Sequence, residues 1–207
     1  MLNLSKAQRK TMIVSAEGAL SALHADSKYG FVLDSKDFKT FMHYYYYCIS
    51  TGDKTLQNNI IKNSSINNAR LSLGSITCNR LLDYQIVIRQ YNSHKLCTLL
   101  IRGIIEKCQQ NPIVKMVLNL SGDSQINFDC GNDTYLGVGP DGLGLNVMGV
   151  LTMIVRSKFN FKGKNGKVYA EDKFTELNSR IRAVELSKPG LSLTTIEEDE
   201  KESVEDD

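Results

Sequence analysis

The chain has 207 residues, 42% hydrophobic and 23% charged, which suits one globular domain or one domain with appendages. No window of about 18 apolar residues occurs, so the sequence predicts no membrane-spanning segment. The first residues also lack the apolar core of a signal peptide, and we expect a protein of the cytoplasm or another reducing compartment.

The formal net charge of +2 is unevenly distributed along the chain. Residues 197–207 carry eight acidic residues and one lysine, which leaves a net charge of +9 on the rest. A basic body suits an anionic partner such as a nucleotide or a nucleic acid. Acidic terminal runs are typical of disordered segments, so we expect a disordered acidic tail that could shield this body.

The five cysteines favour reduced thiols over a structural framework. Their number is odd and no C-x-x-C pair occurs, so we expect neither a disulfide framework nor a metal cluster. The sequence likewise gives no sign of a cofactor. A nucleophilic cysteine would need a histidine nearby in space, which the sequence does not reveal.

The first half of the chain predicts helices and one strand. Apolar residues at three- and four-residue steps predict a helix over Ala7–Leu23. A strand follows within Tyr29–Phe38, with a turn at Asp34-Ser35-Lys36. A helix over Thr40–Thr51 contains four consecutive tyrosines, of which at least one should be buried. The polar, asparagine-rich stretch Lys54–Gly74 predicts a short helix and loops.

The second half has the clearest helical patterns. Ser93–Gln109 shows one apolar stripe and ends before Asn111-Pro112, because proline disfavours a helical predecessor. Ile113–Leu120 predicts a second helical piece. Val147–Arg156 predicts an apolar helix for which Asn146 is placed as the N-cap.

These elements suggest four regions along the chain. We expect an N-terminal helical extension over residues 1–28, a main domain over 29–157, a hairpin and helix over 158–190, and the acidic tail over 191–207. The hairpin would turn at Lys164-Asn165-Gly166, since Asn-Gly suits a type I′ turn, and the helix would span Glu171–Leu186.

The glycine-rich stretch Tyr135–Gly149 reads G-x-G-x-x-G at Gly137, Gly139 and Gly142. A dinucleotide fingerprint needs a buried strand before it and a helix starting inside it, and Pro140 lies where that helix should run. A Walker loop is excluded because no Gly-Lys-Ser/Thr occurs. The stretch therefore predicts a tight multi-turn loop, whose amides ahead of a helix could alternatively seat an anion.

Three blocks of the sequence resemble one family in the same order. The stretch "DTYLGVGPDGLGLNVMGVLTMIVR" looks like the C-terminal signature of the NADAR family, the YbiA-like N-glycosidases. The stretch "YNSHKLCTLLIRGIIEKCQQNP" is similar to the family helix that ends in Q-N-P, and "LDSKDFKTFMHYYYYC" to its strand-turn-helix. The resemblance covers about Phe31–Arg156 and implies a single α+β domain, mainly helical.

The resemblance also implies a ligand and a chemistry. Family members cleave N-glycosidic bonds in riboflavin-pathway intermediates or in ADP-ribosylated guanine, so a pocket for a ribose-phosphate attached to a base is implied. The ligand-binding positions carried over are Tyr46, Tyr91, Gly137, Gly139, Gly142, Gly144 and Asn146.

The sequence departs from the family at its working positions. Met42 replaces a glutamate, Tyr46 a glutamine and Ile49 a lysine; further along, Tyr91 and Leu136 replace tryptophans. Cleavage of a glycosidic bond builds positive charge at the anomeric carbon, which a carboxylate must stabilise and a methionine cannot. Loss of one such electrostatic interaction costs about 10²–10³ in rate.

The remaining candidates for catalysis are weak. Asp37, Asp133 and Asp141 lie within the three blocks, and Asp141 is the one best placed to face a ligand. His43 is retained, although a single helical histidine is more often a packing residue than a base.

Three functions follow as hypotheses. The first is a catalytically degenerate NADAR-fold protein that binds a nucleotide or ribose-phosphate, or serves as a structural component that contacts protein partners. The second is an active N-glycosidase or ADP-ribosyl hydrolase in which Asp141 or His43 carries the chemistry. The third is sequence-independent nucleic-acid binding through the basic body.

Overall fold

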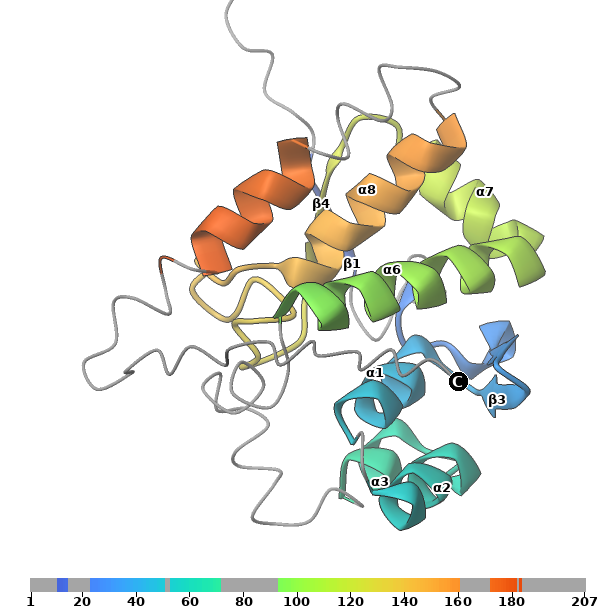
Figure 1. Cartoon of the computed structure of the whole chain (residues 1–207). Helices are drawn as coiled ribbons and strands as arrows, with labels where there is room; N and C mark the ends of the chain where they lie inside the picture. The colour runs from blue at the N-terminus through green and yellow to red at the C-terminus, as the bar shows by residue number, and fades with distance from the viewer. Residues whose placement is uncertain are drawn as a thin grey trace, which may run out of the picture.

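The computed structural model describes residues 11–14, 23–50, 53–71, 93–160, 172–181 and 183. The elements in chain order are β1 (Thr11–Val14), a 3-10 turn (Ser27–Tyr29), β2 (Phe31–Leu33), β3 (Lys36–Phe38), α1 (Phe41–Ile49), α2 (Lys54–Lys62), α3 (Ile66–Leu71), α6 (Ser93–Gln110), α7 (Pro112–Leu120), β4 (Gln125–Phe128) and α8 (Val147–Asn160), shown in Figure 1. Residues 172–181 are also helical. The expected α+β, mainly helical domain is confirmed.

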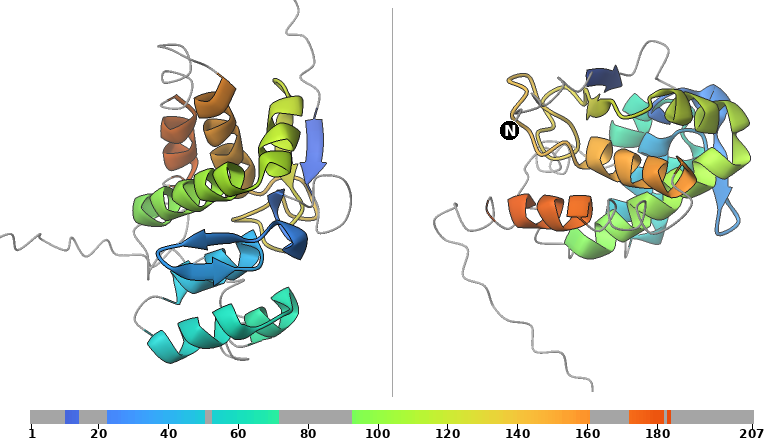
Figure 2. Two further views of the ribbon diagram at one scale, coloured as in Figure 1. Left: turned by 90° about the vertical axis from the view of Figure 1, so that its right-hand side faces the viewer. Right: turned by 90° about the horizontal axis from the view of Figure 1, so that it is seen from above.

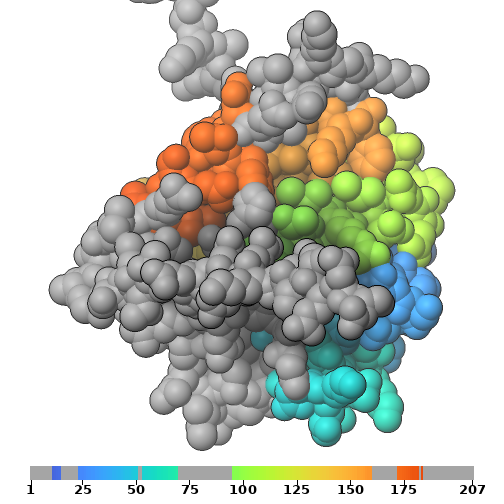
Figure 3. Space-filling view, viewed as in Figure 1, coloured from blue at the N-terminus to red at the C-terminus, as the bar shows by residue number. Residues whose placement is uncertain are grey.

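The long helix α6 divides the domain into two parts. On one side α8 packs against both α6 and β4, and β1 pairs with β4 in parallel from Thr11–Gln125 to Val14–Phe128. On the other side lie α1 and the β2–β3 hairpin, with α2 and α3 beyond α1 (Figures 1 and 2). The surfaces of α6, α8 and residues 172–181 adjoin one another in Figure 3.

The helices predicted from strong apolar patterns are confirmed. The segments predicted over 40–51, 93–109, 113–120 and 147–156 form α1, α6, α7 and α8, and α8 continues to Asn160. Three of the four consecutive tyrosines, Tyr44–Tyr46, are buried. The stretch 54–74 contains two helices rather than one, because a second helix begins at Ile66 after the exit from α2 at Asn63.

The helix predicted over Ala7–Leu23 is wrong at residues 11–14, which form β1. Met12, Ile13 and Val14 are consecutive apolar residues, and so short a run is compatible with both the helical and the strand repeat. Pairing with β4 makes this segment a strand. The strand β4 was not predicted at all. The remainder of the predicted helix lies mostly outside the described residues, as do the hairpin at 164–166 and the acidic tail.

The segment Tyr29–Phe38 forms a hairpin rather than a strand followed by a turn. Asp34 and Ser35 have φ of 50° and 61°, which is the combination of a two-residue type I′ turn, and Lys36 already belongs to β3. The hairpin buries Phe31, Leu33 and Phe38 on one face.

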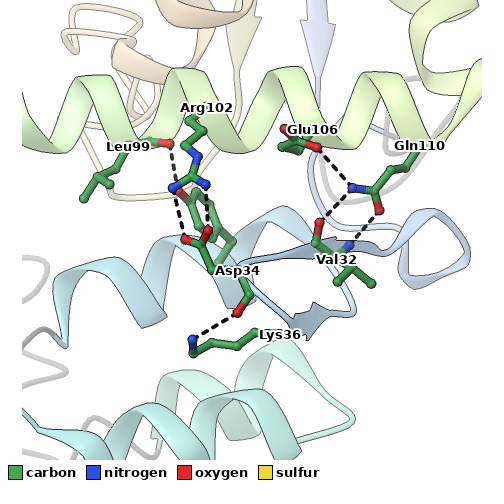
Figure 4. Close-up of polar contacts among 8 residues, drawn as sticks. Val32, Asp34, Lys36, Leu99, Arg102, Glu106 and Gln110 are labelled. Atoms are coloured by element: carbon green, nitrogen blue, oxygen red, sulfur yellow. Dashed lines mark hydrogen bonds and ion pairs between the residues drawn. The ribbon is translucent and has the colours of Figure 1, made fainter.

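Side chains of α6 and of the following Asn111 hold the β2–β3 hairpin and the two residues before it; Figure 4 shows the contacts of Arg102 and Gln110. The Gln110 side chain accepts from Val32 N and donates to Val32 O, both at 2.7 Å, and so caps the strand's outer edge. Asn111 Nδ2 donates to Gly30 O at 2.8 Å, and Lys107 Nζ donates to Tyr29 O at 2.8 Å. The Arg102 guanidinium donates to both carboxylate oxygens of Asp34 at the hairpin turn.

The packing of α8 on β4 depends on Gly149. A Cβ atom at this position would overlap the Ile126 carbonyl of β4 and the side-chain amide of Asn146. The absence of a side chain therefore allows the close approach of helix and strand.

We expect Gly149→Ala to reduce the free energy of unfolding by about 3 kcal/mol, because neither the Ile126 carbonyl nor the buried Asn146 amide can move aside. Urea unfolding followed by circular dichroism measures the loss. Lys158→Ala, on the exposed part of the same helix, is the control and should change stability by no more than about 0.5 kcal/mol. Equal losses in the two variants would contradict the close-approach argument.

Candidate functional site

The first turn of α1 carries Met42, which the sequence resemblance aligns with a family glutamate, and His43, a weak catalytic candidate. Thr40 caps the helix by accepting from His43 N, and this fixes the start of α1. Met42, His43 and Tyr46 are all buried, with exposed fractions of 7%, 1% and 8%. Met42 thus lies inside the apolar core.

His43 is held as a packing residue. Its Nδ1 lies 2.8 Å from Thr40 Oγ1, while Nε2 has no hydrogen-bond partner of good geometry. Burial lowers the pKa of His43, the Lys39 charge lowers it further, and the Asn63 carbonyl opposes both. The ring is enclosed beside Thr40 at the start of α1, so it does not face solvent as a base would.

The second part of the candidate site is the turn before the glycine loop. Asp133 Oδ1 accepts from Tyr135 N at 3.0 Å and from Leu136 N at 2.8 Å, which caps the turn. Tyr135 and Leu136 are buried, and Tyr135 is close enough to Cys97 on α6 to act on the pKa of its thiol. Burial dominates at that thiol and raises its pKa to about 12, so it is not an activated nucleophile.

The structure brings α1 and this turn together. Burial raises the pKa of Tyr45, and the neighbouring Asp133 and Tyr135 raise it further. The rings of Tyr45 and Tyr46 lie 5.6 Å apart. Tyr91, the predicted stacking residue, lies outside the described residues.

The glycine loop uses its backbone amides internally. Gly144 N donates to Val138 O, Leu145 N to Thr134 O and Asn146 N to Gly137 O. Val147 N and Met148 N, at the start of α8, donate to Tyr135 O and Leu136 O. These amides would have formed an anion seat, but they are already paired with carbonyls of the loop.

The glycines have two separate roles in this loop. Gly139 and Gly142 have φ of 67° and 74°, where other residues are strained. Gly137 and Gly144 lie against backbone, and a Cβ at either would overlap a carbonyl of the loop or of Phe128. The glycine pattern is thus explained by the multi-turn path that the sequence predicted.

Asn146 precedes α8 as predicted, but its side chain does not cap the helix. With φ of 53°, the residue turns its amide onto β4, where Nδ2 donates to Ile126 O at 2.8 Å and Oδ1 accepts from Phe128 N at 2.9 Å. The side chain therefore completes the hydrogen bonding of the strand, and the predicted N-cap bond is replaced by this contact.

No carboxylate is buried in the part of the chain that the structure describes. The buried polar side chains are His24, Thr40, His43, Ser50, Lys107, Ser121, Asn146, Thr152, Arg156 and Ser157. Asp141 is exposed near the tip of the glycine loop, with Oδ1 accepting from Leu143 N, and Asp37 is exposed on β3. Within the same described residues, no group of three metal-ligating side chains occurs.

Sequence reasoning missed one buried pair beside the loop. His24 Nε2 lies 3.8 Å from Cys130 Sγ, and its ring meets Phe128 edge-on at 5.5 Å. Burial lowers the pKa of His24 to about 4 and raises that of Cys130 to about 12, so the two remain a neutral imidazole and a thiol. Residues 24 and 130 are far apart in sequence, and no motif links them.

The helix at residues 172–181 lies against the loop from outside. Leu177 and Ile181 are each 1% exposed, and Arg180 donates to Gly144 O at 3.3 Å. This contact covers part of the loop with protein side chains. No helix among the described residues is long and apolar enough to cross a membrane.

Comparisons with known proteins find a likeness in fold. No family model matches the sequence, and no curated protein matches it either. The fold is similar to the NMR structure of the E. coli protein YbiA, with a TM-score of 0.52 at 17% identity over 76% of this chain and 95% of that one. The YbiA-like fold expected from the three sequence blocks is thereby confirmed.

We expect stability to fall as the pH decreases from about 6.5 towards 4. His24 takes up its proton only near pH 4 in the folded state, whereas an unfolded histidine does so near 6.5, so the unfolded chain binds more protons between these values. For one histidine the free energy of unfolding falls by up to about 1.4 kcal/mol per pH unit. His43 adds to this fall, because its pKa is also lowered in the folded state.

Urea unfolding at pH 7.0, 6.0 and 5.0 measures this slope. His24→Gln, which cannot take up a proton, should be less stable at pH 7 but lose less stability between pH 6 and 5. An unchanged slope in this variant would show that His24 is not the group responsible.

Proposed function

We propose that this protein is a non-catalytic domain of NADAR-like fold that acts as an assembly component. The observation that carries this proposal is the lack of any buried carboxylate among the described residues, combined with the apolar side chain of Met42 at the family's glutamate position. An oxocarbenium-like transition state needs negative charge beside the sugar, and neutral packing residues offer none.

Two further features support an assembly role over ribose-phosphate binding. The amides at the start of α8 donate to loop carbonyls, so a phosphate there would have to displace existing hydrogen bonds. Leu136, at a family tryptophan position, is fully buried and offers no aromatic surface to a base. The domain therefore has a glycine loop that is partly covered by the helix at residues 172–181 and offers no evident ligand contact. Such a domain suits a protein that acts through its surface in an assembly.

The alternative is an N-glycosidase with a relocated acid. Asp141 would have to act from an exposed loop while its Oδ1 accepts from Leu143 N, and His43 would have to act from a position that is 1% exposed. Neither geometry favours attack on a bound ribosyl group.

We expect no release of base when the full chain is incubated with ADP-ribosylated guanosine or with a ribosylamino-pyrimidine phosphate, because the described residues bury no carboxylate that could stabilise the transition state. Chromatography of the free base measures the reaction, with a buffer blank as the baseline. Release that disappears in Asp141→Asn or His43→Gln would overturn the proposal.

Ligand binding without turnover needs a separate measurement. ADP-ribose at millimolar concentration should leave the midpoint temperature of thermal unfolding unchanged. If it did bind, a ligand concentration about one hundred times the Kd would raise the free energy of unfolding by about 2.7 kcal/mol. A clear upward shift would favour the nucleotide-binding form of the hypothesis over the assembly form.

A further inference from the structure

We propose that the outer face of α2 and α3 binds the phosphate backbone of nucleic acid, independently of base sequence. This α2–α3 face consists of six exposed residues: Lys54, Asn58, Asn59, Lys62, Asn67 and Asn68. It lies beyond α1, on the opposite side of α6 from α8 (Figure 1). The inference goes beyond the proposed function and does not depend on the state of the glycine loop.

The face is rich in cations and amides and contains no acid. No Asp or Glu occurs between residues 54 and 82, although the chain has 23 acidic residues in all. Asp53, just before α2, is occupied as the N-cap, because Oδ1 accepts from Leu56 N at 2.8 Å. The exposed surface of α2 and α3 therefore presents positive charge and hydrogen-bond donors together.

The positions on α2 align the donors along one stripe. Lys54, Asn58 and Lys62 are spaced by four residues, so they lie on the same side of the helix over about 12 Å. Ile60 is fully buried on the inner side and fixes this orientation. A nucleic-acid strand that runs along α2 would therefore contact Lys54, Asn58 and Lys62 in turn.

Neighbouring lysines extend the positive surface towards β3. Lys39 Nζ donates to Asn63 O at 3.0 Å, at the C-terminal end of α2, and β3 contacts α2. Lys36 Nζ lies 5.6 Å from the ring centre of Tyr47. The acids in this area are Asp53 at the start of α2 and Asp37 on β3, both exposed, and Asp34, which pairs with Arg102; together with Arg102, the lysines at 36, 39, 54 and 62 outnumber them. The local charge stays positive.

The chemistry of the face favours nucleic acid over an acidic protein or a membrane. Among the side chains that the structure describes, the large exposed apolar ones are Ile13, Val32, Ile113, Met116, Leu120 and Leu143, all of which lie outside α2 and residues 66–69 of α3. Protein interfaces usually have an apolar core and membrane contacts need apolar insertion, whereas phosphate contacts need Lys, Asn and backbone donors. Exposed asparagines also weaken a helix without any gain in packing, which is expected where a surface serves binding.

The test is binding of fluorescent single-stranded DNA, single-stranded RNA and duplex DNA to the full chain, by anisotropy at several salt concentrations. We expect affinity to fall linearly with salt on a log–log plot. Lys54→Gln with Lys62→Gln should reduce the steepness of that line by about 1.5, since each phosphate contact contributes about 0.7–0.9. Comparison of the three oligonucleotides distinguishes RNA from DNA as the source of the phosphates.

Two matched variants separate binding from folding. Lys115→Gln with Lys158→Gln removes the same charge from exposed lysines of α7 and α8 and should leave the slope unchanged. Asn58→Ala with Asn59→Ala should stabilise α2 by helix propensity yet weaken binding several-fold, so a weaker complex cannot be attributed to unfolding. The base-release assay does not involve this face and reports separately on the proposed function.

Three results would overturn the inference. The first is the absence of salt-dependent binding to any of the three oligonucleotides. The second is an equal loss from the two lysine pairs, which would indicate non-specific attraction to the basic body as a whole. The third is equally tight binding of poly-glutamate at matched charge, which would assign the face to an acidic protein partner.

Discussion

The fold depends on one close contact, in which the start of α8 and the glycine loop are fastened to β4. Gly149 lets the helix approach the strand, Asn146 bonds the strand's backbone at Ile126 and Phe128, and Val138 N reaches Phe128 O from the loop. A strand of only four residues gains its hydrogen-bond partners from these contacts and from β1. Buried backbone groups must be paired, so this junction could not be loosened without cost to the core around it.

The residues that resemble the family motif divide into two groups by what they contact. Lys107, Gln110 and Asn111 bond the backbone of residues 29, 32 and 30, and Asp133 caps a turn. Arg156 Nη1 donates to Ser121 Oγ at 2.8 Å and to Ser124 O at 2.9 Å. Every one of these contacts maintains the fold. Met42 and Leu136 are packed inside the core and carry no charge. The side chains that hold the fold together are therefore not the ones on which our proposal of a non-catalytic domain depends.

Much of the fold follows from local pattern, whereas the strands do not. The 18 residues of α6 carry a continuous apolar stripe and end before a proline, so both its existence and its end could be predicted. β1 has four residues and becomes a strand only through β4, a partner more than a hundred residues away. The tight path of the glycine loop could be predicted from its glycines. The side-chain contact of Asn146 could not, because it depends on where β4 passes.

The candidate site illustrates the same limit in electrostatic terms. The sequence resemblance suggests that Met42 stands where the family has a glutamate, and that expectation needs no coordinates. It does not reveal that His43 is enclosed beside Thr40, or that the loop amides donate to Thr134, Gly137 and Val138 carbonyls. Those facts decide whether a retained residue can still act. A histidine or a row of amides acts on a ligand only while its polar atoms are accessible, and here the fold has already paired or buried them.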